Sequence, residues 1–309
     1  MLNMSQKNKQ VLITGTVAFD EIETPNGSSG KIIGGAGTYI ALAASIFSKK
    51  ISLISVIGDD FLEKDIEMLQ SKNINTKMIE RILGKKSFYW KGRYHSNFKN
   101  RDTLITELNA LEKFNPIVNE SSRNAEIVVL GNLHPSVQLS VLDQIEENTS
   151  FVLLDTMNFW MDTAIDELKK AISKTDLIVI NDEEAEQLTN EKNLDSAANK
   201  IFEMGPKTVI IKKGDQGSEI FNSKESFYIP AYPVRSVVDP TGAGDCFLGG
   251  LAGYLSTQQQ INLKSLKKAM VFGTVAASYC IENFGVKEVQ DLDFSQIEKR
   301  LEIFKPYLL

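Results

Sequence analysis

Short runs of apolar residues alternate along this chain with longer stretches whose apolar residues recur at helical spacing. The short runs are rich in Val, Ile and Leu and predict strands at Val11–Thr14, Ile51–Ile57, Ile127–Leu130, Phe151–Leu154, Leu177–Ile180, Thr208–Lys212 and Arg235–Val238. The longer stretches predict helices at about 36–48, 61–72, 136–147, 162–173, 183–203 (broken near Asn190), 244–256, 264–282 and 295–304. Strands separated by helices are typical of βαβ units and a mostly parallel sheet.

The residues that directly follow the predicted strands are rich in Gly, Asn and Asp, as in Gly58-Asp59-Asp60 and Gly131-Asn132. Strands as continuously apolar as residues 178–180 suit a sheet that helices cover on both faces. Ligands of such open α/β sheets bind outside the carboxyl ends of the strands. We therefore expect the functional site at this edge of the sheet.

Two stretches, at about 17–33 and 87–111, interrupt the alternation of strands and helices. In the second stretch the side chains alternate between two faces. One face carries Phe88, Trp90, Tyr94 and Ser96, and the other carries Tyr89, Lys91, Arg93 and His95. A period of two with many aromatic residues predicts a small, exposed sheet.

Composition narrows the class of protein. The chain has 309 residues, of which 42% are apolar and 24% charged, and its net charge is −6. This is ordinary globular composition, and the negative charge argues against a nucleic-acid partner. The polar N-terminus and the absence of an apolar run of eighteen residues predict no signal peptide and no membrane span. Cys246 and Cys280 lie in apolar helical contexts, and we expect reduced thiols in a cytoplasmic protein.

The most informative stretch is Asp239-Pro240-Thr241-Gly242-Ala243-Gly244-Asp245, which links a predicted strand to a predicted helix. The first N–H groups of a helix have no partner inside it, and the helix dipole there favours negative charge. The backbone N–H groups of Gly242, Ala243 and Gly244 are therefore predicted to form an anion hole. Asp245 places a carboxylate beside that hole, where it can take a proton from a hydroxyl group.

This string resembles the C-terminal signature of the ribokinase/PfkB family of carbohydrate kinases. Gly34-Gly35-Ala36-Gly37 is similar to the family's N-terminal glycine signature, and the resemblance covers essentially the whole chain. It implies an α/β fold, a ribokinase-like three-layer α/β/α sandwich with a mostly parallel central sheet. Residues 1–309 would form a single kinase domain, and the two interrupting stretches would form a small β-sheet lid. In the family this lid closes over the substrate and often makes a homodimer interface.

The same resemblance implies transfer of the γ-phosphate of ATP to an alcohol hydroxyl of a sugar or sugar derivative. Asp245 would be the general base, and the N–H groups of Gly242, Ala243 and Gly244 would hold the transferred group. The segment Asn181-Asp182-Glu183-Glu184 is similar to the family's Asn-x-x-Glu motif. It implies that Asn181 and Glu184 hold Mg²⁺ through water, although a plain helix N-cap explains the same residues.

The remaining nucleotide-side expectations also come from the family. Asp239 is expected to orient the loop or to bind a cation, and Thr241 to touch the nucleotide phosphates. The loop after residue 212 contains two glycines and is expected to bind ATP. We predict that Lys213, rather than its neighbour Lys212, faces the site. Further nucleotide contacts are predicted for Gly214, Gly217, Asn283 and Gly285. Whether a monovalent cation such as K⁺ is also needed stays open.

On the acceptor side, Asp20 matches the family acid that binds hydroxyl groups. The glycines Gly34 and Gly35 would let the acceptor approach the backbone. Asn158 and the lid residue Arg93 are further predicted contacts. Ribokinase itself has an Asn where this chain has Tyr39, which puts a ribose contact in doubt. The aromatic side chains Tyr39, Trp90, Tyr94, Phe159 and Trp160 favour an alternative acceptor, so a nucleoside (adenosine-like) kinase of the same fold is the second hypothesis.

Other classes of protein fit less well. No Gly-x-Gly-x-x-Gly follows a strand with an acid about twenty residues later, which disfavours a dinucleotide enzyme. No Gly-Lys-Ser/Thr is present, which disfavours a P-loop ATPase. A non-catalytic sensor with this fold would be expected to lose Asp245 and the anion hole, and both are retained.

Overall fold

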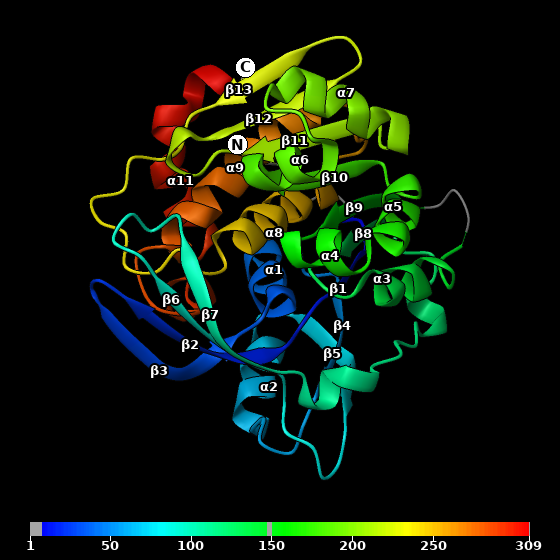
Figure 1. Cartoon of the computed structure of the whole chain (residues 1–309), viewed down its shortest axis with the longest axis vertical. Coiled ribbons are helices and arrows are strands. Elements are labelled where there is room, and N and C mark those ends of the chain that lie inside the picture. The colour runs from blue at the N-terminus through cyan, green and yellow to red at the C-terminus, as the bar shows by residue number, and fades with distance from the viewer. Residues whose placement is uncertain (1–7, 147–149, 309) are drawn as a thin grey trace.

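The structure is a computed structural model that describes residues 8–146 and 150–308. Within these residues, nine strands form the main sheet and four form a second, smaller sheet (Figure 1). The main sheet runs in the order β13 (Ser226–Ile229), β12 (Ser218–Asn222), β11 (Thr208–Lys212), β10 (Leu177–Asn181), β9 (Phe151–Asp155), β8 (Ile127–Leu130), β1 (Val11–Thr14), β4 (Ile51–Ile57) and β5 (Ile74–Arg81). The strands pair in parallel except at the β11–β12–β13 edge, which is antiparallel.

The helices are α1 (Ala36–Ser45), α2 (Glu63–Ser71), α3 (Pro135–Leu142), α4 (Asn158–Thr163), α5 (Ile165–Ser173), α6 (Asp182–Thr189), α7 (Leu194–Met204), α8 (Ala243–Ser256), α9 (Leu263–Cys280), α10 (Lys287–Gln290) and α11 (Phe294–Leu301). Short 3₁₀ turns lie at Asn109–Lys113, Glu120–Ser122, Gly214–Gln216 and Glu302–Tyr307. No helix in the described part of the chain is long and apolar enough to span a membrane.

Helices cover both faces of the main sheet, because its strands are apolar on both sides. Val11 and Ile13 of β1 pack in one core with side chains of α1, α2, α8 and α9. Leu12, between them, packs in a second core with α3, α5 and α7. The alternation of a buried strand thus builds two cores, one on each face. The predicted three-layer α/β/α architecture is confirmed.

The predicted elements differ from the structure in a few places. The segment Arg235–Val238 was predicted as a strand and is not one, because its backbone pairs with loops. The Val238 N–H donates to the Ile281 carbonyl (2.8 Å), and the Val237 carbonyl accepts from the Asn26 side chain (2.7 Å). The prediction missed β5, β12, β13 and the short helix α4, and its helix at 162–173 corresponds to α5. The predicted helix end at residue 147 lies outside the described residues, and α3 ends at Leu142.

The smaller sheet, called the lid below, has the order β3 (Gly27–Gly34), β2 (Ala18–Thr24), β6 (Tyr89–Tyr94) and β7 (Arg101–Glu107). Its strands come from the two stretches that interrupt the main alternation. Its outer face carries a charged network, in which Lys91 contacts Glu21 (2.8 Å) and Glu23 (3.1 Å), and Arg93 contacts Glu23 (2.7 Å). Its inner face carries other side chains, among them Asp20 and Trp90, which sit opposite each other in the β2–β6 pairing.

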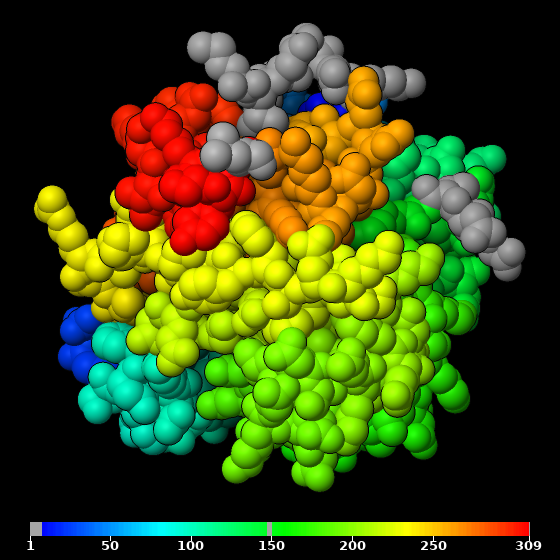
Figure 2. All heavy atoms as spheres, turned by 90° about the horizontal axis from the view of Figure 1, so that it is seen from above, coloured from blue at the N-terminus to red at the C-terminus, as the bar shows by residue number. Residues whose placement is uncertain are grey.

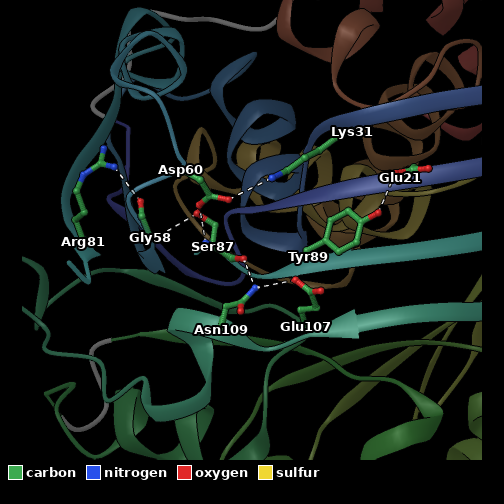
Figure 3. A network of polar contacts seen from close by, with 9 residues as sticks. All are labelled: Glu21, Lys31, Gly58, Asp60, Arg81, Ser87, Tyr89, Glu107 and Asn109. Atoms are coloured by element: carbon green, nitrogen blue, oxygen red, sulfur yellow. Dashed lines mark hydrogen bonds and ion pairs between the residues drawn. The ribbon is translucent and has the colours of Figure 1, made fainter. Parts of the chain in front are cut away.

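The lid is attached to the main sheet through Ser87, just before β6 (Figure 3). The Ser87 hydroxyl accepts a hydrogen bond from the Gly58 N–H (2.9 Å), and the Ser87 N–H donates to the Asp60 carboxylate (2.7 Å). Asn109, after β7, donates to the Ser87 carbonyl (2.9 Å), and Lys31 of β3 pairs with Asp60 (3.2 Å). These contacts connect both ends of the β6–β7 hairpin, and also the edge strand β3, to the loop between β4 and α2.

Helix α8 packs against α1 with very little space between the backbones. A Cβ atom at Gly249 would lie 2.3 Å from the Ile40 carbonyl oxygen, and one at Gly253 would lie 2.7 Å from the Ala44 carbonyl oxygen. Backbone atoms cannot move aside as the end of a side chain can. The spacing between the two helices is therefore set by glycine.

We predict that Gly249→Ala destabilises the protein by about 1–3 kcal/mol through overpacking. Helix propensity alone would favour Ala over Gly by about 1 kcal/mol, so the sign of the change is informative. Urea unfolding followed by circular dichroism measures it. Asn199→Ala at an exposed position of α7 is the control for propensity and should stabilise slightly. A Gly249→Ala variant that is more stable than the parent would contradict the close packing.

Candidate active site

The turn that leads into α8 is held by a buried acid. Asp239 has no exposed surface, and its carboxylate accepts hydrogen bonds from the N–H groups of Thr241 (2.9 Å) and Gly285 (3.4 Å). Gly242, the N-cap of α8, has a φ of 78°, a left-handed conformation that side chains rarely adopt. The helix therefore begins directly after a tight turn at the carboxyl-end edge of the sheet.

Two of the three predicted anion-hole donors are free. The N–H groups of Gly242 and Gly244 have no hydrogen-bond partner among the described residues. The Ala243 N–H, in contrast, donates to the Pro240 carbonyl (3.2 Å), which corrects the prediction that it is available. Free N–H groups at a helix N-terminus attract anions.

A buried lysine adds a full positive charge at the same helix terminus. A Cβ atom at Gly244 would lie 2.9 Å from Lys212 Nζ, so this ammonium group lies directly beside the start of α8. Lys212 ends β11 and pairs with Asp155 at the end of β9 (3.2 Å), and their side chains are only 18% and 9% exposed. The anion hole thus combines backbone dipoles with a cation held in place by a buried carboxylate.

Asp245 lies in the first turn of α8, and its carboxylate has no hydrogen-bond partner among the described residues. Burial and the negative charge of Asp155 together raise its pKa to about 8, although the charges of Lys212 and Arg101 oppose the shift. A carboxyl group with a pKa near neutrality is suited to accept a proton from a hydroxyl group. The predicted position of Asp245 beside the free N–H groups matches the structure.

Asn181 and Glu184 form a capping box at the start of α6. Asn181 Oδ1 accepts from the Glu184 N–H (2.7 Å), and Glu184 Oε2 accepts from the Asn181 N–H (2.8 Å). The N-cap explanation of this motif is therefore correct. The same residues can also have a functional role, because Glu184 is buried close to the charges of Lys212 and Asp155. Burial raises its pKa to about 7, and the charge of Lys212 lowers it.

These residues fit a Mg²⁺ ion of the kind that retains most of its waters. No group of three or more His, Cys, Asp or Glu side chains within residues 8–146 and 150–308 is placed to hold a metal. Mg²⁺ in phosphoryl-transfer sites needs only one or two protein carboxylates. The second carboxylate oxygen of Glu184 accepts no hydrogen bond from the described residues and is available for such a role.

On the other side of Asp245, Asp20 projects from the lid strand β2 to the N-terminus of α1. Its carboxylate accepts from the Gly35 N–H (3.3 Å), and it is 5% exposed. A Cβ atom at Gly34 would lie 1.9 Å from Asp20 Oδ2, so glycine is required there. Burial raises the pKa of Asp20 to about 7, while the Gly35 N–H lowers it. This is the position at which an acceptor hydroxyl was predicted to bind.

Tyr39 lies beneath the anion hole rather than at its surface. It is 1% exposed, and a Cβ atom at Gly242 would lie 2.6 Å from its ring. Its buried hydroxyl has no hydrogen-bond partner among the described residues. The ring supports the turn before α8, and direct stacking of Tyr39 on an acceptor, one of the predicted roles of the aromatic residues, does not fit this position.

The lid touches the main domain at two loops, and Figure 2 shows its cyan residues packed against the yellow-green part of the chain. Thr241 Oγ1 donates to the Tyr94 hydroxyl (3.2 Å), which joins β6 to the turn before α8. At the tip of the β6–β7 hairpin, Lys99 pairs with Asp215 in the loop after β11 (3.1 Å). The structure therefore represents the chain with its lid closed onto these loops.

Three predicted site residues point elsewhere. Arg93 is on the outer face of the lid with Glu23, so the predicted acceptor contact is not supported. Lys213 pairs with Glu219 (3.0 Å) and lies 4.6 Å from the Tyr228 ring centroid, so Lys212 is the lysine that faces the site. Asn158 donates to Gln187 of α6 (2.5 Å), at the border of the site.

The remaining predicted nucleotide residues lie in two loops next to the turn before α8. Gly214 and Gly217 shape the tight turn after β11, where both have positive φ. Gly285 donates to Asp239, as described above. Asn283 donates to Glu288 (3.1 Å) in the same loop after α9. Their contacts with a nucleotide stay a prediction.

Sequence reasoning missed three residues of the charged cluster: Asp155, Lys212 and Arg101. Asp155 follows a predicted strand and belongs to the Gly/Asn/Asp pattern at the sheet edge, so a signal for it was present. Which of two adjacent lysines faces the site depends on the orientation of β11, which the pattern leaves open. Arg101 acts on the pKa values of Asp20, Glu184 and Asp245 from the lid, and only the pairing of β6 with β7 places it there.

Comparison with known proteins shows the family and the fold of this chain. Residues 10–291 match the family model described as the pfkB family carbohydrate kinase. The chain is 27% identical to a cytidine kinase of Thermococcus kodakarensis over 251 residues, which covers 79% of this chain and 88% of that protein. It resembles the Arabidopsis thaliana ribokinase solved with ribose and ATP, with a TM-score of 0.77 at 20% identity over 96% of this chain and 99% of that one. It also resembles a ribokinase II of E. coli solved with ATP and Mg²⁺, with a TM-score of 0.79 at 19% identity over 96% and 99% of the two chains.

The structural likenesses show the ribokinase fold, and the family match covers the turn before α8, the Asn181–Glu184 motif and the lid. The Asp245 carboxylate, the free N–H groups and Lys212 at one sheet edge suit phosphoryl transfer to an alcohol. The chain belongs to the pfkB family of carbohydrate kinases, phosphotransferases with an alcohol group as acceptor.

Proposed function

We propose that this protein transfers the γ-phosphoryl group of ATP to a hydroxyl of a sugar or sugar derivative, with Asp245 as the general base. The observation that carries the proposal is the joint position of Asp245, the free N–H groups of Gly242 and Gly244, and Lys212 Nζ at the start of α8. A base and an anion hole at one helix terminus are what an attacking hydroxyl and a transferring phosphoryl group need.

The proposed reaction is a displacement at the γ-phosphorus of ATP. The acceptor oxygen forms a bond to the γ-phosphorus while its proton passes to the Asp245 carboxylate. The bond between the γ-phosphorus and the bridging oxygen breaks, and its electron pair leaves with ADP. Gly242, Gly244 and Lys212 stabilise the charge on the transferring group. Mg²⁺, bound near Glu184 through water, would neutralise phosphate charge, and Asp20 would hold and orient the acceptor.

A nucleoside acceptor is the second candidate, and one observation favours it. Trp90 lies on the inner face of the lid, paired with Asp20 across β2 and β6. A sugar ring held by Asp20 would bring an attached base close to this indole, where stacking is favourable. The similarity to a cytidine kinase points the same way.

Two further parts of the proposal concern assembly and ions. The edge strand β7 is exposed along its whole length, and Leu104 and Ile105 are 39% and 42% exposed, so we propose that the lid forms a homodimer. The fully buried carboxylate of Asp239 next to the 283–285 loop is proposed to bind a monovalent cation such as K⁺. Light scattering and a comparison of K⁺ with choline buffers test these two points.

The same proposal includes a single kinase domain and contacts with the nucleotide from Gly214, Gly217, Thr241, Asn283 and Gly285.

The test of the function is release of ADP from Mg-ATP across a panel of sugars, sugar acids, sugar phosphates and nucleosides. We expect activity on one class, and Asp245→Asn should lower kcat by about 10²–10⁴-fold without loss of folding. Activity confined to nucleosides would move the assignment to the second candidate. Full activity in Asp245→Asn would refute the role of the base.

The raised pKa of Asp245 predicts the pH dependence of the reaction. Below about pH 8 the carboxyl group is protonated in the free enzyme and cannot accept the proton. We therefore expect kcat/KM to rise tenfold per pH unit and to level off above about pH 8, because kcat/KM reports groups of the free enzyme. A profile that is flat between pH 6 and 9 would contradict this prediction.

Lys212 is predicted to act on the reaction and not only on folding. Lys212→Met should lower kcat by about 10²–10³-fold, and it also leaves the Asp155 charge buried and unpaired, which destabilises the protein. In the double variant Lys212→Met/Asp155→Asn no charge of the pair is left, so thermal stability should recover while kcat stays low. Recovery of activity together with stability would show that Lys212 is purely structural.

A further inference from the structure

The inner and outer faces of the lid carry different arginines. In the antiparallel pairing of β6 with β7, Arg93 is opposite Asp102 and Tyr94 is opposite Arg101. Cross-strand partners point to the same face and successive residues to opposite faces. Arg93 pairs with Glu23 on the outer face, so Tyr94 and Arg101 lie together on the inner face. The lid therefore presents one of its arginines to the site.

Tyr94 shows where that part of the inner face lies. Its hydroxyl accepts a hydrogen bond from Thr241 Oγ1 (3.2 Å), in the turn that carries the anion hole. Arg101 is its cross-strand partner, and the positive charge of Arg101 acts on the carboxylates of three different elements. These are Asp20 on the lid strand β2, Glu184 at the start of α6 and Asp245 at the start of α8.

Each of the three carboxylates has a different role in the proposed reaction. Asp20 is on the acceptor side, Glu184 on the metal side, and Asp245 is the base between them. The pairing of Arg101 with Tyr94, whose hydroxyl contacts Thr241, puts this cation on the side of the lid that faces the turn before α8.

Arg101 also keeps its donors available. It forms no ion pair with any acid within residues 8–146 and 150–308, unlike Arg93, Lys91 and Lys212. Its guanidinium carbon lies 5.6 Å from the centroid of the Trp90 ring, which fixes the side chain from one side. The Trp90 ring lies over Gly92, where a Cβ atom would be 2.1 Å from the indole. Arg101 is thus oriented by an aromatic ring and by Tyr94, with most of its five donors free for an anion.

We propose that Arg101 is a catalytic residue of the lid that binds the phosphoryl group during its transfer. This inference rests on the proposed kinase function and adds a residue to it. The main domain then contributes Lys212 and the Gly242 and Gly244 N–H groups to the anion hole, and the lid contributes Arg101. Because β7 belongs to the lid, the phosphoryl site is complete only while the lid contacts the loops of the main domain, as it does in this structure.

The first test measures nucleotide binding without an acceptor. Isothermal titration compares MgADP with the non-hydrolysable β,γ-imido analogue of MgATP. We expect Arg101→Met to weaken the analogue by about tenfold or more while MgADP changes less than twofold, because only the analogue has a γ-phosphoryl group. Arg93→Met, on the other face of the same sheet, is the matched control and should change neither. Equal affinities of Arg101→Met and the parent for the analogue would overturn the proposal.

The second test separates catalysis from acceptor binding, using whichever compound of the panel is phosphorylated. Arg101→Met should lower kcat by about 10²–10³-fold with an acceptor KM within threefold of the parent, and Arg101→Lys should recover part of the loss. Thermal melting checks that both variants stay folded. A raised KM with unchanged kcat would show that Arg101 binds the acceptor instead and would overturn the proposal. A parent protein that binds neither nucleotide would refute the kinase function itself.

Discussion

The burial of like charges at the N-terminus of α8 is the constraint on which the rest of the site depends. Asp20, Asp155, Glu184, Asp239 and Asp245 gather there, and burial raises the pKa of every one of them. Lys212 and Arg101 offset only part of this charge. A site with such an excess of carboxylates is held in place by the surrounding fold, and it favours ligands that bring cations with them. Nucleotide phosphates enter such a site as their Mg²⁺ complexes, which fits the proposed reaction.

The parts of the site that are local in sequence could be predicted from the sequence, because they depend on a few consecutive residues. The turn from Asp239 to Asp245 and the glycines at the start of α1 are examples, and both take the expected places. Residues selected by strand register could not be predicted in this way. Lys212 and Lys213 are adjacent, and one step along β11 decides which of them meets Asp155 and which meets Glu219.

The same reason explains the lid. The alternation of its aromatic and charged residues was visible in the sequence and correctly placed Arg93 opposite to Trp90 and Tyr94. The partner strand β7 has no clear pattern, since all of its residues are exposed. Its register to β6, shifted by an irregularity near Lys91, is what brings Arg101 beside Tyr94. The strand predicted at Arg235–Val238 failed for a related reason, because an apolar run becomes a strand only where a neighbouring strand can pair with it.

The close contact of α1 with α8 has a consequence for how such enzymes diverge. The N-terminus of α1 carries Gly35 on the acceptor side, and the N-terminus of α8 carries the anion hole, so Gly249 and Gly253 join the two reacting sides into one rigid unit. The distance between the N-termini of α1 and α8 is then independent of the lid. Substitutions on β2, β6 and β7 can alter which alcohol is accepted while this distance stays constant. New acceptor specificities can therefore evolve at lid positions other than Arg101 without a change in the spacing of the two helix N-termini.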